Sequence, residues 1–193
     1  MNKKLLLLFI SAIILLTGCT DSKPIDKASI AESVTVNKNE YTFFILSSKE
    51  TPEKIKVNAE SFRDACELAK QKYIPDLSLA KLELFIINEK IYNDVLREDI
   101  KYISTQSFFS PQIYITLSDI NTIKDMNENK EQSEKIEEQI ILLKNKNKDL
   151  NTNCLSVYNN ISDKKTKEFN VPYITTQDEM RADTKKITIK NEK

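Results

Sequence analysis

Residues 82–87 read L-E-L-F-I-I, a nearly continuous apolar run that predicts a strand buried within a sheet. Residues 88–102 follow with a helical pattern, and residues 112–117 form a second β-type run just after Pro111. A strand, a helix and a strand in this order are typical of parallel neighbours joined by a right-handed crossover. The stretch therefore predicts a sheet that contains parallel strands.

An antiparallel hairpin precedes this unit. Residues 30–36 and 41–46 are apolar and partly β-branched. Residues 37–39 (Asn-Lys-Asn) are expected to form the turn, with asparagine in the left-handed positions that glycine usually takes. Residues 55–57 predict a short third strand, and a helix capped by Asn58 is expected to extend to about residue 73.

Helices are expected to dominate the C-terminal half, the first of them capped by Ser118. The helical stretches cover residues 119–126, 132–144 and 152–161. A strand over residues 171–175 is expected at a sheet edge because it contains Pro172. The predicted fold class is α+β: a mixed β-sheet, made of the N-terminal hairpin and strands linked by crossover helices, packed with several helices.

The beginning of the chain has the pattern of a bacterial lipoprotein signal. Lys3 and Lys4 precede about twelve apolar and small residues (5–16), too few to span a bilayer core of roughly 30 Å as a stable helix. The run ends in a sequence that resembles the lipobox: Leu16, Thr17, Gly18 and Cys19. Cleavage between Gly18 and Cys19 would leave a cysteine that carries a diacylglyceryl group and further acyl chains, which anchor stably because more than one chain is present.

These patterns divide the chain into four predicted segments. They are a signal peptide (1–18), a lipidated tether (19–29), an α+β domain (30–176) and a polar C-terminal tail (177–193), in which residues 187–189 could form a lone short strand. An ordinary secretory signal or an N-terminal membrane helix is the alternative interpretation of the first segment. Cys66 and Cys154 lie on apolar faces of predicted helices. They are expected either to be free thiols that pack as small hydrophobic side chains or to form a disulfide with each other.

Composition excludes several function classes. The chain has 193 residues with one glycine, Gly18, and no histidine. Glycine-rich nucleotide loops and nucleophile elbows need glycine for close backbone approach, and Ser-His-Asp or Cys-His catalysis needs histidine. Lys and Arg number 29, as do Asp and Glu, so no basic excess indicates nucleic acid as a partner.

Candidate catalytic residues are few. Ser78 and Lys81 match the S-x-x-K of penicillin-recognising enzymes, but the K-T-G strand that completes such a site is absent and the spacing is common by chance. Carboxylates cluster at helical spacing opposite the apolar stripe, which favours a solvated helix face over paired acid catalysis. They are Glu60, Asp64, Glu67, Glu131, Glu134, Glu137 and Glu138.

Aromatic side chains are interpreted as core rather than as a ligand platform. They are Tyr41, Phe43, Phe44, Phe85, Phe108 and Phe109. No residue is therefore assigned a catalytic role, and the chain is predicted to be no enzyme and to need no metal or cofactor beyond the lipid on Cys19.

The order of elements and several phrases resemble the N-terminal domain of the spore germination receptor C-subunit lipoproteins of Bacillus- and Clostridium-type bacteria. Residues 19–26 keep the aspartate, the basic residue and the Ile-Asp pair of that family's start, without its tryptophan and glutamate. Residues 60–65 and 80–89 are similar to its helix and to its following apolar strand, whose two glycines are replaced here. Residues 170–174 are similar to its L-P-x-I element, after which family members continue into a larger second domain that this chain is expected to lack.

The resemblance implies a non-enzymatic lipoprotein on the outer face of the spore inner membrane, with the membrane-embedded A and B receptor subunits as partners. Cys19 would hold it to the membrane and the α+β domain would supply a docking surface. Two alternatives stay open. One is an unrelated envelope lipoprotein that binds a small molecule or cell-wall component, and the other is a hydrolase that uses Ser78 and Lys81.

Overall fold

The structure is a computed structural model that describes residues 29–46, 53–128, 132–163, 165, 168–176 and 180–189. The strands are β1 (Ile30–Asn37), β2 (Glu40–Leu46), β3 (Lys54–Asn58), β4 (Leu84–Asn88), β5 (Tyr114–Ser118), β6 (Glu168–Thr175) and β7 (Arg181–Thr188). The helices are α2 (Phe62–Lys72), α3 (Tyr92–Thr105), α4 (Ile120–Glu128), α5 (Gln132–Lys146) and α6 (Cys154–Ser162).

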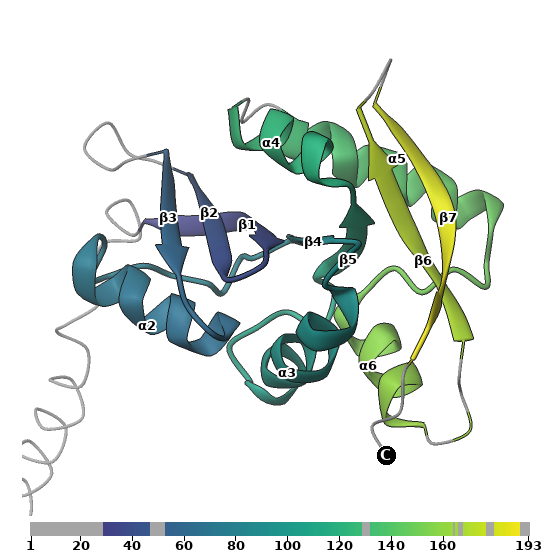
Figure 1. Ribbon diagram of the computed structural model, residues 1–193, viewed down its shortest axis with the longest axis horizontal. Coiled ribbons are helices and arrows are strands. Elements are labelled where there is room, and N and C mark those ends of the chain that lie inside the picture. Colours follow the sequence, from purple (N-terminus) through teal and green to yellow (C-terminus); the bar gives the residue numbers. More distant parts are fainter. Residues whose placement is uncertain are drawn as a thin grey trace, which may run out of the picture.

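The described strands form one mixed sheet in the order β3-β2-β1-β4-β5-β6-β7 (Figure 1). β1, β4, β5 and β6 are parallel to one another, whereas β2, β3 and β7 run antiparallel to their neighbours. The L-E-L-F-I-I run supplies β4, which is central in the sheet and buried at every residue. The predicted α+β class with a mixed sheet is confirmed.

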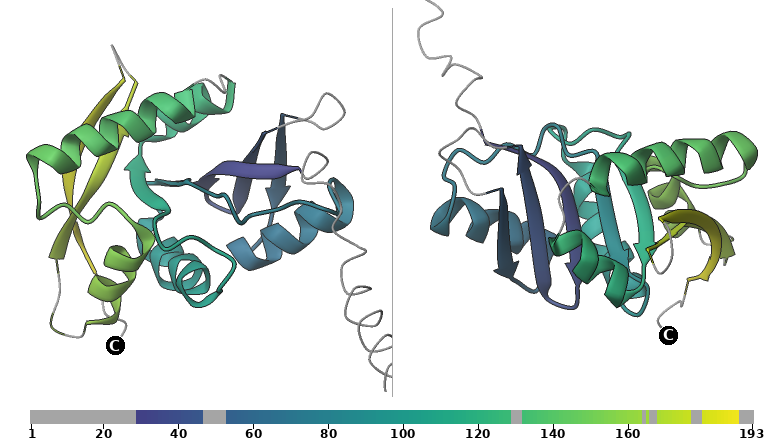
Figure 2. Two further views of the ribbon diagram at one scale, coloured as in Figure 1. Left: turned by 180° about the vertical axis from the view of Figure 1, so that it is seen from behind. Right: turned by 90° about the horizontal axis from the view of Figure 1, so that it is seen from above.

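Helices cover both faces of the sheet (Figure 2). α2, α3 and α6 pack with the larger apolar cluster on one face, and α4 and α5 pack with a smaller cluster on the other. The alternation along β4 explains this division, because Phe85 and Ile87 belong to the first cluster while Leu84 and Ile86 belong to the second. A strand with two apolar faces thus requires a helical layer on each side.

Phe62 is the centre of an aromatic cluster beneath the sheet. Its ring is fully buried and lies 5.0 Å, centroid to centroid, from Phe85 in an edge-to-face arrangement. Four further rings lie within 6.3 Å of it: Tyr41, Phe43, Tyr102 and Phe109. These rings come from β2, β4, α3 and the segment after α3, so the cluster joins the start of α2 to the sheet and to its neighbouring helix.

The hairpin turn and two helix caps differ in detail from the sequence predictions. Lys38, not an asparagine, takes the left-handed conformation, with φ of 56°. Ser61 rather than Asn58 caps α2, because its hydroxyl accepts a hydrogen bond from the Asp64 N–H at 3.2 Å. Asp119 rather than Ser118 precedes α4 as the cap, and its carboxylate accepts from the N–H of Thr122 at 3.0 Å.

The C-terminal region corrects two predictions. β6 is not an edge strand, because β5 lies on one side of it and β7 pairs with it along its whole length. Residues 181–188 therefore belong to the sheet and not to a polar tail, and β7 extends well beyond the short strand expected at 187–189.

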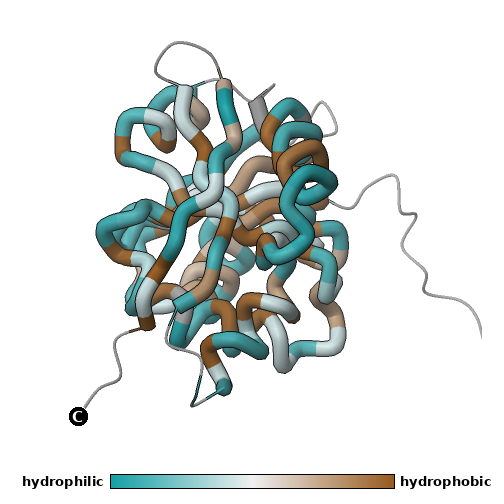
Figure 3. Tube along the Cα trace, turned by 90° about the vertical axis from the view of Figure 1, so that its right-hand side faces the viewer, coloured by the Kyte–Doolittle hydropathy of each residue, from teal (hydrophilic) through white to brown (hydrophobic). Residues whose placement is uncertain are grey.

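Seen from the β7 side, hydrophobic positions recur between hydrophilic ones along the chain (Figure 3). β7 is mostly exposed, and Lys185 and Lys186 lie on this edge strand, where charges discourage further pairing.

The other predicted elements match observed ones with ends that differ by at most four residues. A buried polar network ties α4 to the N-terminal hairpin at the point where β1 and β2 carry threonine side chains. The Thr35 hydroxyl donates to Asn127 Oδ1 at 2.9 Å, and Asn127 Nδ2 donates to Thr42 Oγ1 at 3.4 Å. The network holds the last turn of α4 against the hairpin, because buried polar groups left without partners would be costly.

Candidate functional site

The S-x-x-K residues do not form a catalytic pair. Ser78 follows α2 beside the start of β1, and its hydroxyl accepts a hydrogen bond from the Ala80 N–H at 3.5 Å. Lys81 is exposed, and no hydrogen bond among the described residues joins it to Ser78. A serine nucleophile needs a base within hydrogen-bond reach, so this arrangement gives no support to the hydrolase alternative.

The predicted carboxylate clusters are mainly solvated. Asp64 and Glu67 are exposed on α2, where Glu67 lies 3.7 Å from the Arg63 guanidinium. On α5, Glu138 is exposed and Glu137 is half-buried, and burial, assisted by the charge of Glu83, raises the pKa of Glu137. Glu131 lies outside the described residues, and the side chain of Glu134 is not among those described.

Most of the predicted core aromatics are buried. Phe43 and Phe85 are fully enclosed, and Tyr41, Phe44 and Phe109 are nearly so. Phe108 is the exception, with 46% of its surface exposed. The interpretation as core is therefore confirmed for five of the six rings, of which Tyr41 and Phe109 also line pockets.

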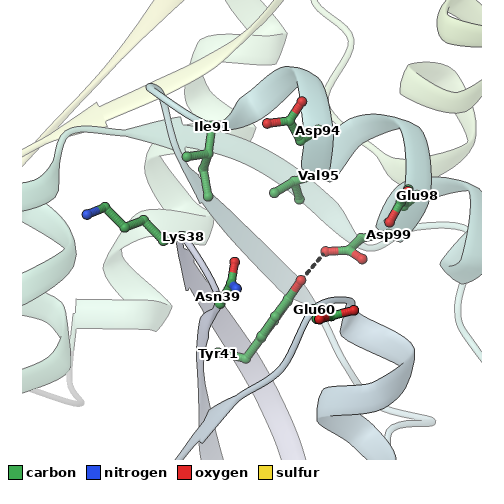
Figure 4. Close-up of a pocket in the computed structure, with 9 residues that line it drawn as sticks. All are labelled: Lys38, Asn39, Tyr41, Glu60, Ile91, Asp94, Val95, Glu98 and Asp99. Carbon is green, nitrogen blue, oxygen red and sulfur yellow. Dashed lines mark hydrogen bonds between the residues drawn. The ribbon is translucent and has the colours of Figure 1, made fainter.

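An open pocket of about 350 Å³ lies where β1 and β4 end (Figure 4). Lys38 and Asn39 come from the β1–β2 turn, Tyr41 from the start of β2 and Glu60 from the segment before α2. The remaining lining residues lie just before and along α3: Ile91, Asp94, Val95, Glu98 and Asp99. The carboxyl ends of parallel strands and the helix that follows β4 thus place side chains from four chain segments around one cavity.

Asp99 and Tyr41 form a buried hydrogen-bonded pair at the base of this pocket. The Tyr41 hydroxyl donates to Asp99 Oδ2 at 2.8 Å (Figure 4). The backbone N–H of Phe62 donates to Asp99 Oδ1 at 2.8 Å. Asp99 is 2% exposed, and burial raises the pKa of its carboxyl to about 6, although the two hydrogen bonds oppose the rise. Burial, and then the Asp99 charge, raise the pKa of the Tyr41 phenol, so Tyr41 stays a neutral donor.

The pocket carries more negative than positive charge. Glu60, Asp94, Glu98 and Asp99 contribute carboxylates, and Lys38 contributes the one ammonium group among the lining residues. No group of three or more metal-binding side chains is arranged to hold an ion within the described residues. The carboxylates of the lining can therefore attract cations, and the buried one can hold a proton. The lining residues include no paired nucleophile and base and thus show no catalytic constellation.

Asp99 was missed from the sequence although a signal for it exists. It lies four residues after buried Val95 and four before buried Ile103, on the apolar face of α3. A carboxylate at an apolar position of an amphipathic helix indicates a buried partner. Its partner Tyr41 lies 58 residues away, which no local pattern identifies.

Both remaining cysteines are free and buried, Cys66 on α2 and Cys154 at the start of α6. The disulfide left open by the sequence is not formed. Burial raises the pKa of the Cys66 thiol, and raises that of Cys154 to about 11 despite its contact with the Ser104 hydroxyl at 3.2 Å. Neither has the lowered pKa of a reactive thiol.

The signal peptide, the lipobox with Leu16, Thr17, Gly18 and Cys19, and all but the last residue of the tether lie outside the described residues. Among the described helices, none is both long and apolar enough to cross a membrane. The predicted lipid attachment at Cys19 is therefore still a prediction.

Comparison with known proteins identifies one relationship. A family model described as spore germination protein N-terminal domain matches residues 21–176, which is most of the chain. Neither the comparison with curated proteins nor that with solved structures found a match.

Proposed function

The chain belongs to the spore germination protein N-terminal domain family, as a germinant receptor C-subunit N-terminal domain with a role in germination, and we propose that it acts there as a lipid-anchored, non-enzymatic component. The family match over residues 21–176 is the observation that carries the proposal. It replaces the alternative of an unrelated envelope lipoprotein.

The lipid anchor is supported by the position of the match. The matched region begins two residues after Cys19, which is where a protein processed at the lipobox would begin its mature chain. Acyl chains on Cys19 would hold the domain at the outer face of the spore inner membrane. Tethering of this kind raises the local concentration of the domain near membrane-embedded partners, which we propose are the receptor A and B subunits.

A non-enzymatic role is supported by the geometry of the candidate residues. Ser78 and Lys81 do not form a pair, the described carboxylates of α2 and α5 face mainly solvent, and both buried thiols are protonated. The pocket around Asp99 offers a buried proton-binding group without a nucleophile.

The proposal is tested with a Cys19→Ala variant in dormant spores, with Thr20→Ala as the matched control in the same segment. We expect the wild type and the control in the inner-membrane fraction, and the Cys19→Ala protein lost from it, with slower nutrient germination in that strain. Inhibition of the lipoprotein signal peptidase should leave an uncleaved form.

Two results would contradict the proposal. Retention of the Cys19→Ala protein in washed inner membranes would show that Cys19 is not the anchor. Unchanged nutrient germination in a strain that lacks the gene would separate the chain from receptor function.

A further inference from the structure

The described chain begins at one end of the molecule, which we call the tether end: residues 29–30, Leu46, residues 70–73 and Ser78. Ile30 pairs with Leu46 at the end of β2, and the Ser78 N–H donates to the Ser29 carbonyl at 2.8 Å. The end of α2 and the start of β1 lie together at the left of Figure 1, opposite α5 and β7, and both views of Figure 2 agree. The chain that connects the domain to Cys19 therefore leaves the domain at this end.

The tether end exposes side chains that suit a lipid headgroup surface. Tyr73, just after α2, is 52% exposed, and Leu46 is 50% exposed. Lys70 and Lys72 lie in the last turn of α2, beside Tyr73, and are exposed. Tyrosine is favoured at membrane–water interfaces and lysine near anionic lipids. Two exposed acids oppose them: Asp76 after α2, and Glu53, whose carbonyl accepts from the Ile45 N–H beside the end of β2.

The length of chain before the domain favours the tether end as the one that lies at the bilayer. Ten peptide steps separate Cys19 from Ser29, and they span at most about 36 Å when fully extended. The eight residues of β1 cover about 26 Å, so the carboxylate-rich pocket at the other end of β1 would reach the surface only with the tether extended over most of its maximum length. The exposed carboxylates of this pocket, those of Glu60, Asp94 and Glu98, would also face anionic lipid at a cost.

On this basis, and resting on the lipid anchor proposed above, we propose that the tether end lies against the headgroup surface of the membrane, through Tyr73, Leu46 and the lysines of α2. The Asp99 pocket then faces away from the bilayer, toward the aqueous side. The anchor and the contact act together, because acylation holds the domain within reach and the contact fixes its orientation.

The absence of tryptophan from the chain allows a direct test. Three full-length acylated variants, Tyr73→Trp, Leu46→Trp and Leu142→Trp, each carry one reporter. Leu142 is 52% exposed, the same as Tyr73, and belongs to α5, which lies on the side of the molecule opposite the end of α2 (Figure 1). Each variant is reconstituted into vesicles of phosphatidylcholine and phosphatidylglycerol that contain a headgroup nitroxide quencher, and flotation measures anchoring separately.

We expect all three variants to float, with the emission of the Tyr73→Trp and Leu46→Trp proteins quenched at least twofold more strongly than that of Leu142→Trp. Equal quenching in floated samples overturns the orientation while leaving the anchor intact. If the Tyr73→Trp and Leu46→Trp proteins are preferentially quenched only when receptor subunits are added, the orientation is also overturned, because that result assigns this surface to a protein partner. Acylated protein that does not float overturns the anchor and the orientation together.

Discussion

Replacing Asp99 with asparagine should stabilise the protein at neutral pH and abolish part of its pH dependence. The carboxyl is 2% exposed, and burial raises its pKa from 3.8 to about 6. Because the folded state holds this proton more tightly than the unfolded state, the stability linked to Asp99 is complete below pH 3.8 and is lost as the pH rises through 6. Each tenfold change in proton affinity is about 1.4 kcal/mol, so the rise in pKa from 3.8 to about 6 corresponds to roughly 3 kcal/mol of folding free energy.

Asparagine has nearly the shape of the protonated carboxyl and can still accept the hydrogen bond from the Phe62 N–H, which spans 2.8 Å in the wild type. The Asp99→Asn protein should therefore match the wild type near pH 3.5 and exceed its free energy of unfolding by up to roughly 3 kcal/mol near pH 7.5. Urea unfolding of the detergent-solubilised protein, followed by circular dichroism from pH 3.5 to 7.5, measures both curves.

Asp94→Asn is the matched control, because Asp94 lines the same pocket but is exposed. Its stability should follow the wild-type pH dependence with a small constant offset, since its carboxylate is solvated. If the difference between the Asp99→Asn and wild-type free energies stays constant from pH 4 to 7.5, the reasoning about a buried, proton-binding Asp99 is wrong.

Three further changes test the packing, the turn and the thiols. Phe62→Ala removes the centre of the aromatic cluster and should lower the free energy of unfolding by about 3–5 kcal/mol in urea melts, and a loss below about 1 kcal/mol would contradict that central role. Lys38→Gly should raise stability by about 0.5–1 kcal/mol, because glycine relieves the left-handed φ of 56°, whereas Asn39→Gly should not. Cys66 and Cys154 should react with Ellman's reagent at pH 8 only after urea is added, since burial raises the pKa of both thiols; rapid reaction of the folded protein would refute their enclosure.

The candidate site was only partly accessible to sequence reasoning. The sequence could place the turn at Lys38 and the helix that carries Asp99, because both follow from local patterns of apolar and turn residues. The sequence did not predict that the turn and the helix line one pocket, because Tyr41 and Asp99 are 58 residues apart and meet only through strand pairing and helix packing. The left-handed φ at Lys38 likewise depends on how the β1–β2 register, with Asn37 opposite Glu40, closes the turn.

The types of the elements other than β7, the mixed sheet and the family resemblance followed from the sequence alone, because apolar periodicity and motif order are local properties of the chain. The tertiary structure decided what depends on distant partners. Residues 171–175 lie inside the sheet because polar β7 pairs with β6, although Pro172 alone favours an edge. The tether end is decided in the same way, since strand pairing places Leu46 opposite Ile30 and the Ser78 N–H bonds to the Ser29 carbonyl, where the described chain begins.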